Sequence, residues 1–554
     1  MCHHSLEADT TLGNSLVSLL VDVGSVHDAR WVFNVLPVRH ESSWNFLISG
    51  YSKAEEPDCA LTLYDHMQND KTLHPCGTTY AAALKACTQL KTLQKGRQIH
   101  AQVASLGLLE MDSFVGSTLL DMYAKCGFIA KAQQVFDDLP ICNVVSWTAL
   151  IGGYVEHGEG EEALRCFQVM QDKGISPNRI TFICTLKACA MTGDVSKGQE
   201  VHAEVARQGL SGKDIVVGNS LVYMYAKFGM LVSAQEVFDR LPMQNIVSWT
   251  SIISGYAEDG KDEEAINCFE EMQIKGIFPN AITLGCVMKA CSSLRFISKG
   301  QDIHAEIERK GLLQTNDIAL GNALIDMYAT CGQLKKAQEV FTNIPAPNVI
   351  TWTTLISGYA ENGYAEEALK AFELMETKGA LPNSITLIYG LKACGSIKAV
   401  GKGRDIQVEI ERQGLLERDS LAANALIDMY VKCGLLSIAQ EVFDKLSVRD
   451  VISWNILISG YSEHGYGKEA LQHSEQMQLE GAVADDVTLV SRFKACGLAG
   501  ATCKVNMVLK QQMQVDKLII ANSSETSEDE VKDKSATFKH KLEESILDNL
   551  VKGI

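Results

Sequence analysis

Tryptophan residues at a fixed interval are the feature of this sequence that most limits its fold. Five of the six tryptophans recur every 102 or 103 residues, inside similar segments such as VSWTALIGGY and VSWTSIISGY. They are Trp44, Trp147, Trp249, Trp352 and Trp454. A chain of 554 residues is too long for one ordinary globular core. The regular interval therefore predicts a tandem array in which each unit packs on its neighbours.

Each period divides into three helical hairpins. In one period the three segments span 144–178, 179–214 and 215–245 and contain 35, 36 and 31 residues. Each segment has two stretches with apolar residues at i, i+3, i+4 and i+7, a spacing typical of amphipathic helices. A turn around Gly158 separates the stretches, and Pro177 ends the first hairpin. Because one hairpin cannot bury its apolar face alone, we expect an all-α, right-handed α-solenoid (superhelix) of tandem helix-turn-helix repeats, with the first helices lining a concave surface.

Charge and cysteine usage limit the possible functions. The formal net charge is −18, the wrong sign for general attraction to a phosphate backbone. Acidic runs such as EGEEA and KDEEA begin second helices, so we expect the acidic residues to lie away from the first-helix surface. No apolar run reaches the roughly 18 residues that a membrane span needs. Most of the seventeen cysteines recur at repeated positions without a CxxC pair, so we expect buried thiols, a reducing compartment, and no metal or cofactor.

Two recurring segments carry a family resemblance. NSLVYMYAKFG, NALIDMYATCG and NALIDMYVKCG form one set, and LKACG followed by KGRDIQVEI is an example of another. They resemble the plant pentatricopeptide-repeat family, in its subclass of alternating P, L and S repeats. The rival tetratricopeptide array has 34-residue units that would not cycle through 35, 36 and 31 residues. We expect residues 1–9 to be the remnant of a truncated L repeat, 10–500 an array of about 15 repeats, and 501–554 a degenerate repeat end with a polar, partly disordered tail.

The resemblance sets a register for the array. The P repeats are predicted to start at Glu41, Val144, Ile246, Val349 and Val451. The S repeats are predicted to start at Thr10, Ser113, Ile215, Ile318 and Ser420. The L repeats are predicted to start at Gly77, Arg179, Ala281, Ser384 and Asp486.

The resemblance also implies that the fifth and last residues of P and S repeats face an RNA base. Tandem helical repeats that recognise one base each are an established mode of RNA binding. An Asp carboxylate at the last position can accept the N3 hydrogen of uracil or the N1 hydrogen of guanine. An Asn amide can donate to cytosine N3 or adenine N1. By the family rule, Asn at the fifth position goes with pyrimidines and Thr or Ser with purines.

Eight repeats carry a well-formed pair. Adenine is predicted for Ser117 with Asn143, Thr148 with Asn178, Thr250 with Asn280, and Thr353 with Asn383. Cytosine is predicted for Asn219 with Asn245 and Asn322 with Asn348, and uracil for Asn424 with Asp450 and Asn455 with Asp485. In order these pairs predict the target 5′-AANCANCANUU-3′, in which N is any base. The structural alternative is that these side chains only cap helices or turns.

The remaining repeats depart from that pattern. Asn14 pairs with His40 and Asn45 with Cys76, and both are expected to favour a pyrimidine. L repeats have apolar or small fifth residues and should be weakly selective: Ala81, Ile183, Gly285 and Ile388. Apolar second residues resemble the family's wedges between adjacent bases: Val145, Val247, Ile350 and Ile452.

These expectations combine into a functional hypothesis. The chain is expected to bind single-stranded RNA in organellar RNA processing or modification, including recognition of C-to-U editing sites with a deaminase-bearing or other RNA-processing partner. A protein–protein interaction scaffold is the alternative. The resemblance implies a mitochondrion or chloroplast, although the N-terminus shows no transit peptide. We expect no enzyme activity, because the HAE segments at His202 and His304 lack the PCxxC that a zinc deaminase needs.

Overall fold

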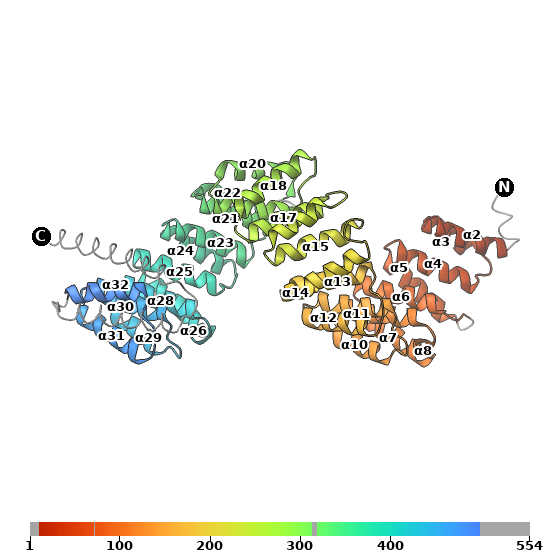
Figure 1. The fold of residues 1–554 in the computed structure, drawn as a ribbon, viewed down its shortest axis with the longest axis horizontal. Coiled ribbons are helices and arrows are strands. Elements are labelled where there is room, and N and C mark those ends of the chain that lie inside the picture. Colours follow the sequence, from red (N-terminus) through yellow and green to blue (C-terminus); the bar gives the residue numbers. More distant parts are fainter. Residues whose placement is uncertain (1–9, 71–72, 313–317, 499–554) are drawn as a thin grey trace. The chain divides into compact units, whose positions relative to one another are not determined.

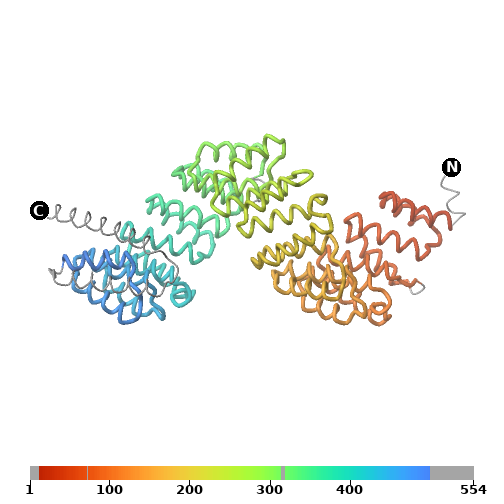
Figure 2. Tube along the Cα trace, viewed as in Figure 1, coloured from red at the N-terminus to blue at the C-terminus, as the bar shows by residue number. Residues whose placement is uncertain are grey.

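The regular secondary structure of this chain is helical. The computed structural model describes residues 10–70, 73–312 and 318–498, and no strand occurs within these ranges (Figure 1). Two compact units make up the chain, Met1–Leu294 and Arg295–Ile554. Within each unit, successive helices turn back on one another in pairs (Figure 2).

The first helix of each pair begins at a predicted repeat start. In the first unit these helices are α2 (Thr10–Asp22), α4 (Glu41–Lys53), α6 (Gly77–Leu90), α9 (Ser113–Lys125), α11 (Val144–Glu156), α13 (Arg179–Thr192), α15 (Ile215–Lys227), α17 (Ile246–Glu258) and α19 (Ala281–Ser293). In the second unit they are α21 (Ile318–Thr330), α23 (Val349–Glu361), α25 (Ser384–Ile397), α28 (Ser420–Lys432), α30 (Val451–Glu463) and α32 (Asp486–Leu498). All fifteen predicted starts coincide with a helix start, so the predicted all-α solenoid of tandem helix pairs is confirmed.

The second helices complete the pairs. In the first unit they are α3 (Val26–Val35), α5 (Pro57–Asn69), α7 (Leu93–Ser105), α10 (Ile129–Asp138), α12 (Gly160–Asp172), α14 (Val195–Arg207), α16 (Leu231–Asp239) and α18 (Asp262–Ile274). In the second unit they are α20 (Ile297–Arg309), α22 (Leu334–Asn343), α24 (Ala365–Thr377), α26 (Val400–Arg412), α29 (Leu436–Asp444) and α31 (Gly467–Leu479). Two further helices of four residues, α8 (Leu108–Met111) and α27 (Leu415–Arg418), were not predicted.

The first helices form a continuous layer inside each unit. Each first helix packs on the neighbouring first helices of its own unit, and most second helices pack on their own partner and on the first helix that follows. The first helices are therefore buried on several sides. Helix α11 buries seven of its residues, while α12 buries one stripe of Gly160, Ala163, Phe167 and Met170. A surface built on this layer carries the N-termini and one exposed face of every first helix.

Two recurring contacts hold neighbouring repeats in register. Each tryptophan of the sequence repeat meets a phenylalanine of the preceding second helix edge to face, with ring centroids 4.6 to 4.7 Å apart. The five tryptophans thus occupy equivalent places, as predicted. A glycine in each GY segment lets first helices approach closely, because a Cβ on Gly153 would lie 2.7 Å from that of Ala124.

Some predictions concern parts of the chain outside the described residues. The truncated L repeat at residues 1–9 and the tail at 501–554 both lie there. None of the described helices is long and apolar enough to cross a membrane.

Candidate nucleic-acid interface

The predicted base-contacting residues occur at one recurring place, the junction between consecutive first helices. The fifth residue of a repeat lies on its first helix, and the last residue comes directly before the next first helix. Six of the residues at the fifth position of the eight well-formed pairs are only 3 to 8% exposed. They are Ser117, Thr148, Asn219, Thr353, Asn424 and Asn455. Thr250 and Asn322 are half-buried, and the last residues are half-buried or exposed, so the last residue is the more accessible member of every pair except Thr250 with Asn280, where both are half-buried.

The last residue of each of the eight well-formed pairs accepts hydrogen bonds from the N-terminus of the following helix. The Oδ1 atom of Asn178 accepts the backbone N–H of Thr181 at 2.9 Å, and Asp450 accepts that of Ser453 at 2.7 Å. The other last residues accept a backbone N–H in the same way: Asn143, Asn245, Asn280, Asn348, Asn383 and Asp485. The last residues of these pairs are therefore helix caps, as the alternative to base recognition expected.

Capping also determines what each side chain can offer to a ligand. The Oδ1 atom of a capping asparagine is occupied, which leaves its Nδ2 group as a donor. At five of these asparagines, Nδ2 donates no hydrogen bond within the described ranges: Asn178, Asn245, Asn280, Asn348 and Asn383. A capping aspartate instead keeps acceptor capacity on Oδ2. Asn and Asp caps therefore present opposite hydrogen-bonding groups at equivalent places.

In three repeats the side chains of the fifth and last residues hydrogen bond to each other directly. The amide of Asn219 donates to Oδ1 of Asn245 at 3.1 Å. In the second unit, Asn424 donates to both oxygens of Asp450 at 3.3 and 3.2 Å. Asn455 donates to both oxygens of Asp485 at 2.9 Å.

In the repeats with threonine at the fifth position the two residues meet through a third side chain. Thr148 contacts the hydroxyl of Thr181 at 2.7 Å, and Thr181 donates to Asn178 at 3.1 Å. The same arrangement links Thr250 to Asn280 and Thr353 to Asn383 through Thr283 and Thr386, respectively. The sequence alone did not identify these bridging threonines, although their recurrence in every L repeat was visible.

Other predicted pairs are not joined. Ser117 donates to the carbonyl of Ser113, and Asn143 donates to the Ser113 hydroxyl at 3.2 Å. Among the described residues, no hydrogen bond joins Asn322 to Asn348, and Oδ1 of Asn322 is buried without a partner.

The two departing pairs are arranged differently again. Oδ1 of Asn14 accepts the backbone N–H of His40 at 3.0 Å. Asn45 accepts the hydroxyl of Thr79, which also contacts Cys76 at 3.3 Å.

Asp485 is held as a carboxylate. Burial raises the pKa of this carboxyl group, but hydrogen bonds from the backbone and hydroxyl of Thr488 and from Asn455 outweigh burial and lower the pKa below its ordinary value. Asp485 therefore remains an acceptor near neutral pH.

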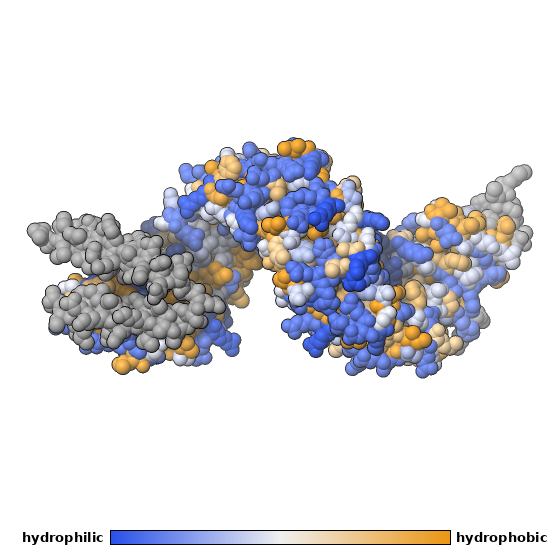
Figure 3. Space-filling view, viewed as in Figure 1, coloured by the Kyte–Doolittle hydropathy of each residue, from blue (hydrophilic) through white to orange (hydrophobic). Residues whose placement is uncertain are grey.

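Apolar second residues project from the same ends of the first helices. The four predicted wedges, Val145, Val247, Ile350 and Ile452, are 49, 51, 59 and 53% exposed. First helices of L and S repeats also carry exposed second residues: Phe114, Ile180, Val216, Ile282, Ile385, Leu421 and Val487. Single apolar side chains scattered on a largely hydrophilic surface are also visible on the face drawn in Figure 3.

The two kinds of helix differ sharply in charge. The fifteen first helices contain eleven lysines and arginines against ten aspartates and glutamates. The fourteen paired second helices contain sixteen basic residues against thirty-two acidic ones. The negative charge of the chain is thus concentrated on the second helices, as expected, and the first-helix layer is close to neutral.

The HAE segments have structural partners. Nδ1 of His202 lies 2.8 Å from the hydroxyl of Tyr225, and Glu204 pairs with Arg207. Burial lowers the pKa of His202, with a smaller contribution from Arg240. In the L repeat that starts at Ser384, a glutamine replaces this histidine and accepts the equivalent tyrosine hydrogen bond. No group of three or more potential metal ligands occurs among the described residues.

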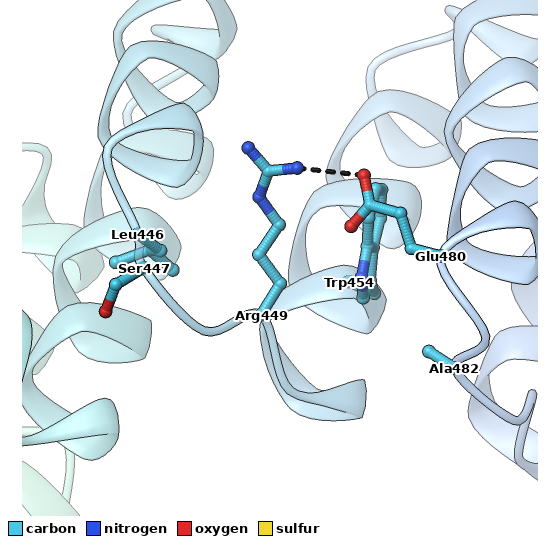
Figure 4. Close-up of a pocket in the computed structure, with 6 residues that line it drawn as sticks. All are labelled: Leu446, Ser447, Arg449, Trp454, Glu480 and Ala482. Carbon is cyan, nitrogen blue, oxygen red and sulfur yellow. Dashed lines mark hydrogen bonds and ion pairs between the residues drawn. The ribbon is translucent and has the colours of Figure 1, made fainter.

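A cavity of about 400 Å³ lies beside the last P repeat. Its lining residues are Leu446, Ser447, Arg449, Trp454, Glu480 and Ala482 (Figure 4). Arg449 donates to Glu480 at 2.9 Å and lies 5.0 Å from the ring of Phe443. Lys173 and Lys275 lie over the tryptophan rings of two earlier P repeats at 5.4 and 4.9 Å. A basic side chain beside the phenylalanine–tryptophan pair thus recurs in three P repeats. We therefore interpret this cavity as a feature of repeat packing rather than a ligand site.

Comparison with known proteins identifies the class to which these features belong. The PPR repeat family model matches residues 142–191, 244–293 and 347–395. The PPR repeat model matches residues 42–71, 117–144, 219–246, 322–344, 422–451 and 452–481. The chain belongs to the pentatricopeptide repeat family.

Relatives in Arabidopsis thaliana cover nearly the whole described array. A chloroplastic pentatricopeptide repeat-containing protein is 35% identical over 486 residues, which are 88% of this chain and 55% of the relative. A second chloroplastic one is 32% identical over 88% of this chain and 78% of its own length. A mitochondrial one is 32% identical over 90% of this chain and 71% of its own length. The chain spans only 55 and 58% of the first two relatives that it matches.

Solved structures share the fold. The pentatricopeptide repeat protein PPR10 from maize superposes with a TM-score of 0.57 at 18% identity, over 92% of this chain and 84% of that protein. PPR10 in complex with an 18-nt psaJ RNA element superposes with a TM-score of 0.62 at 16% identity, over 91 and 84% of the two chains.

Proposed function

We propose that this chain binds single-stranded RNA in a sequence-specific manner, with one base recognised by each P and S repeat of a PLS-type array. The observation that carries the proposal is the opposite chemistry of Asn and Asp caps at equivalent places. The free Nδ2 of Asn178 or Asn245 suits adenine N1 or cytosine N3. The Oδ2 of Asp450 or Asp485 suits the N3 hydrogen of uracil.

The two members of a pair have different tasks in this proposal. The last residue makes the principal contact with the Watson–Crick edge, because it is the more accessible one in seven of the eight pairs. The fifth residue holds the last residue in place from beneath, directly as in Asn219 or through a threonine as in Thr148. The target remains 5′-AANCANCANUU-3′.

Neighbouring features support an extended single strand as the ligand. Exposed second residues such as Val145 and Val247 can pack against the faces of consecutive bases. The acidic residues lie mainly on second helices, so the first-helix layer does not repel phosphates strongly. Maize PPR10, which shares the fold, is described in complex with an 18-nt RNA element.

The relatives suggest a cellular setting. They include chloroplastic and mitochondrial proteins, which supports the proposal that this chain acts in an organelle, in RNA processing or modification. We propose recognition of C-to-U editing sites, with the deaminase supplied by a partner protein. The activity of the complete relatives is part of this proposal, since the chain spans only part of the first two.

Selection from a random pool of single-stranded RNA tests the proposal. The purified chain should enrich a sequence that matches AANCANCANUU, with every third position unrestricted. Enrichment of no sequence, or equal retention of double-stranded RNA, would reject base recognition. In that case a protein–protein scaffold would be the better assignment.

A further inference from the structure

The third residue of every L repeat is a buried threonine. These residues are Thr79, Thr181, Thr283, Thr386 and Thr488, and each is 0% exposed. Each hydroxyl lies between the fifth and the last residue of the preceding P repeat and contacts both. An L repeat thus reaches into the predicted base-contacting pair of its neighbour.

The contacts of Thr181 show the arrangement. Its hydroxyl lies 2.7 Å from that of Thr148 and donates to Oδ1 of Asn178 at 3.1 Å. Its backbone N–H donates to the same Oδ1 at 2.9 Å. The hydroxyl of Thr148 also donates to the carbonyl of Val144 at 2.6 Å. Because Thr148 donates its only hydroxyl proton to Val144, the Thr181 hydroxyl shares its proton between Thr148 and Oδ1 of Asn178, and Nδ2 of Asn178 stays unused.

The same bridge occurs with other partners. Thr283 lies 2.7 Å from Thr250 and donates to Asn280 at 2.8 Å. Thr488 donates to Oδ1 of Asn455 at 2.5 Å and to Asp485 at 2.8 Å. The bridge is thus independent of whether the pair is predicted to select a purine or a pyrimidine.

P repeats show at most half of this bridge within the described ranges: the hydroxyl of Thr351 donates to the last residue Asn348 at 3.0 Å, and that of Ser43 donates to the fifth residue Asn14. The third residue of the P repeat after Asn245 is Ser248, whose hydroxyl donates to the backbone carbonyl of Asn245 at 2.8 Å. It does not contact the fifth residue, Asn219, which reaches Asn245 directly. The third residues of S repeats are apolar, as in Val115 and Val217. The bridge is therefore a feature of L repeats, the repeats expected to select bases only weakly themselves.

We propose that the L-repeat threonines are positioning residues that set the base preference of the preceding P repeat. The inference rests on the proposed function, because it assumes that Thr148 and Asn178 recognise a base. Without the bridging hydroxyl, Oδ1 of Asn178 loses one of its two donors and Thr148 loses a buried partner. The amide is then held less firmly in the orientation that presents Nδ2 to adenine.

Base preference at the second position of the 11-mer tests the proposal. Competition binding should compare RNAs with A, G, C or U there, for the full chain and for Thr181→Val and Thr181→Ser. Thr181→Val should reduce the preference for adenine about five-fold, the scale of one neutral hydrogen bond. Thr181→Ser restores a hydroxyl and should restore the preference. The other ten positions should be unaffected.

Ser248→Ala is the matched control. It removes a buried hydroxyl from the same helix position and weakens a cap, but it breaks no link to a fifth residue. It should lower the melting temperature without changing the cytosine preference at the fourth base. If Thr181→Val lowers the melting temperature and keeps the full adenine preference, Thr181 is only structural and the inference is wrong. If the unmodified chain has no preference at the second base, the proposed function itself fails.

Discussion

Replacing Asp450 with Asn should convert one uracil-selecting repeat into a cytosine-selecting one. The first unit already contains the product of this change, because Asn219 and Asn245 form the equivalent pair with Asn at both positions. There Oδ1 of Asn245 accepts two backbone N–H groups and the Asn219 amide, and its Nδ2 is free. An asparagine at 450 should adopt this arrangement and donate to cytosine N3 where Asp450 accepted from uracil.

The size of the switch follows from the contacts. A specific contact with a base edge is worth roughly 1–3 kcal/mol, which is about one to two decades in relative affinity. The fold should tolerate the change, because Asn and Asp are about equally good helix caps. The cap bond from Ser453 at 2.7 Å and the contact with Asn424 can both be retained.

Competition binding with C or U at the tenth position of the 11-mer measures the switch. The ratio of the two affinities cancels the general effect of removing one negative charge. Asn245→Asp is the reciprocal variant and should move the fourth base from C toward U. If Asp450→Asn still prefers U, or loses affinity equally for all four bases, Asp450 is a helix cap alone.

Two further predictions concern pH dependence and the absence of catalysis. Burial lowers the pKa of His202, so the unfolded state binds more protons than the folded state around pH 6.5, and the free energy of unfolding should fall as the pH drops from 7.5 to 5.5. His202→Gln should reduce this pH dependence in thermal melts. An unchanged slope of melting temperature against pH would exclude this histidine as a cause. Glu204→Ala should leave RNA affinity unchanged, and metal analysis of the purified chain should find no stoichiometric zinc; one tightly held zinc per chain would overturn the non-catalytic assignment.

The register that the family resemblance set gave the first helix starts to the residue, and most of these starts are marked by a side-chain cap. Asn178 precedes α13 and Asp450 precedes α30, and both side chains bond to the helix that follows. The short helices α8 and α27 were missed because four residues give no periodic pattern. Both follow a glycine with positive φ, Gly107 or Gly414, and this glycine could have indicated an extra turn.

The sequence predicts which positions form the candidate site, but not which side chains contact one another there. Chain register identifies Thr148 and Asn178 as a pair, but the bridge through Thr181 joins residues 33 positions apart. Such a contact depends on how one first helix packs against the next. The deep burial of most fifth residues also arises from that packing, and the pattern of polar residues does not reveal it.

A substitution scan of the 11-mer tests whether each P and S repeat recognises one base. Each position of 5′-AANCANCANUU-3′ is changed in turn to the three other bases, and the affinity of the chain for each RNA is measured at one salt concentration. We expect large losses at eight positions and little effect at the third, sixth and ninth, which face L repeats. Equal losses at all eleven positions, or none at any, would show that the fifth and last residues do not recognise bases.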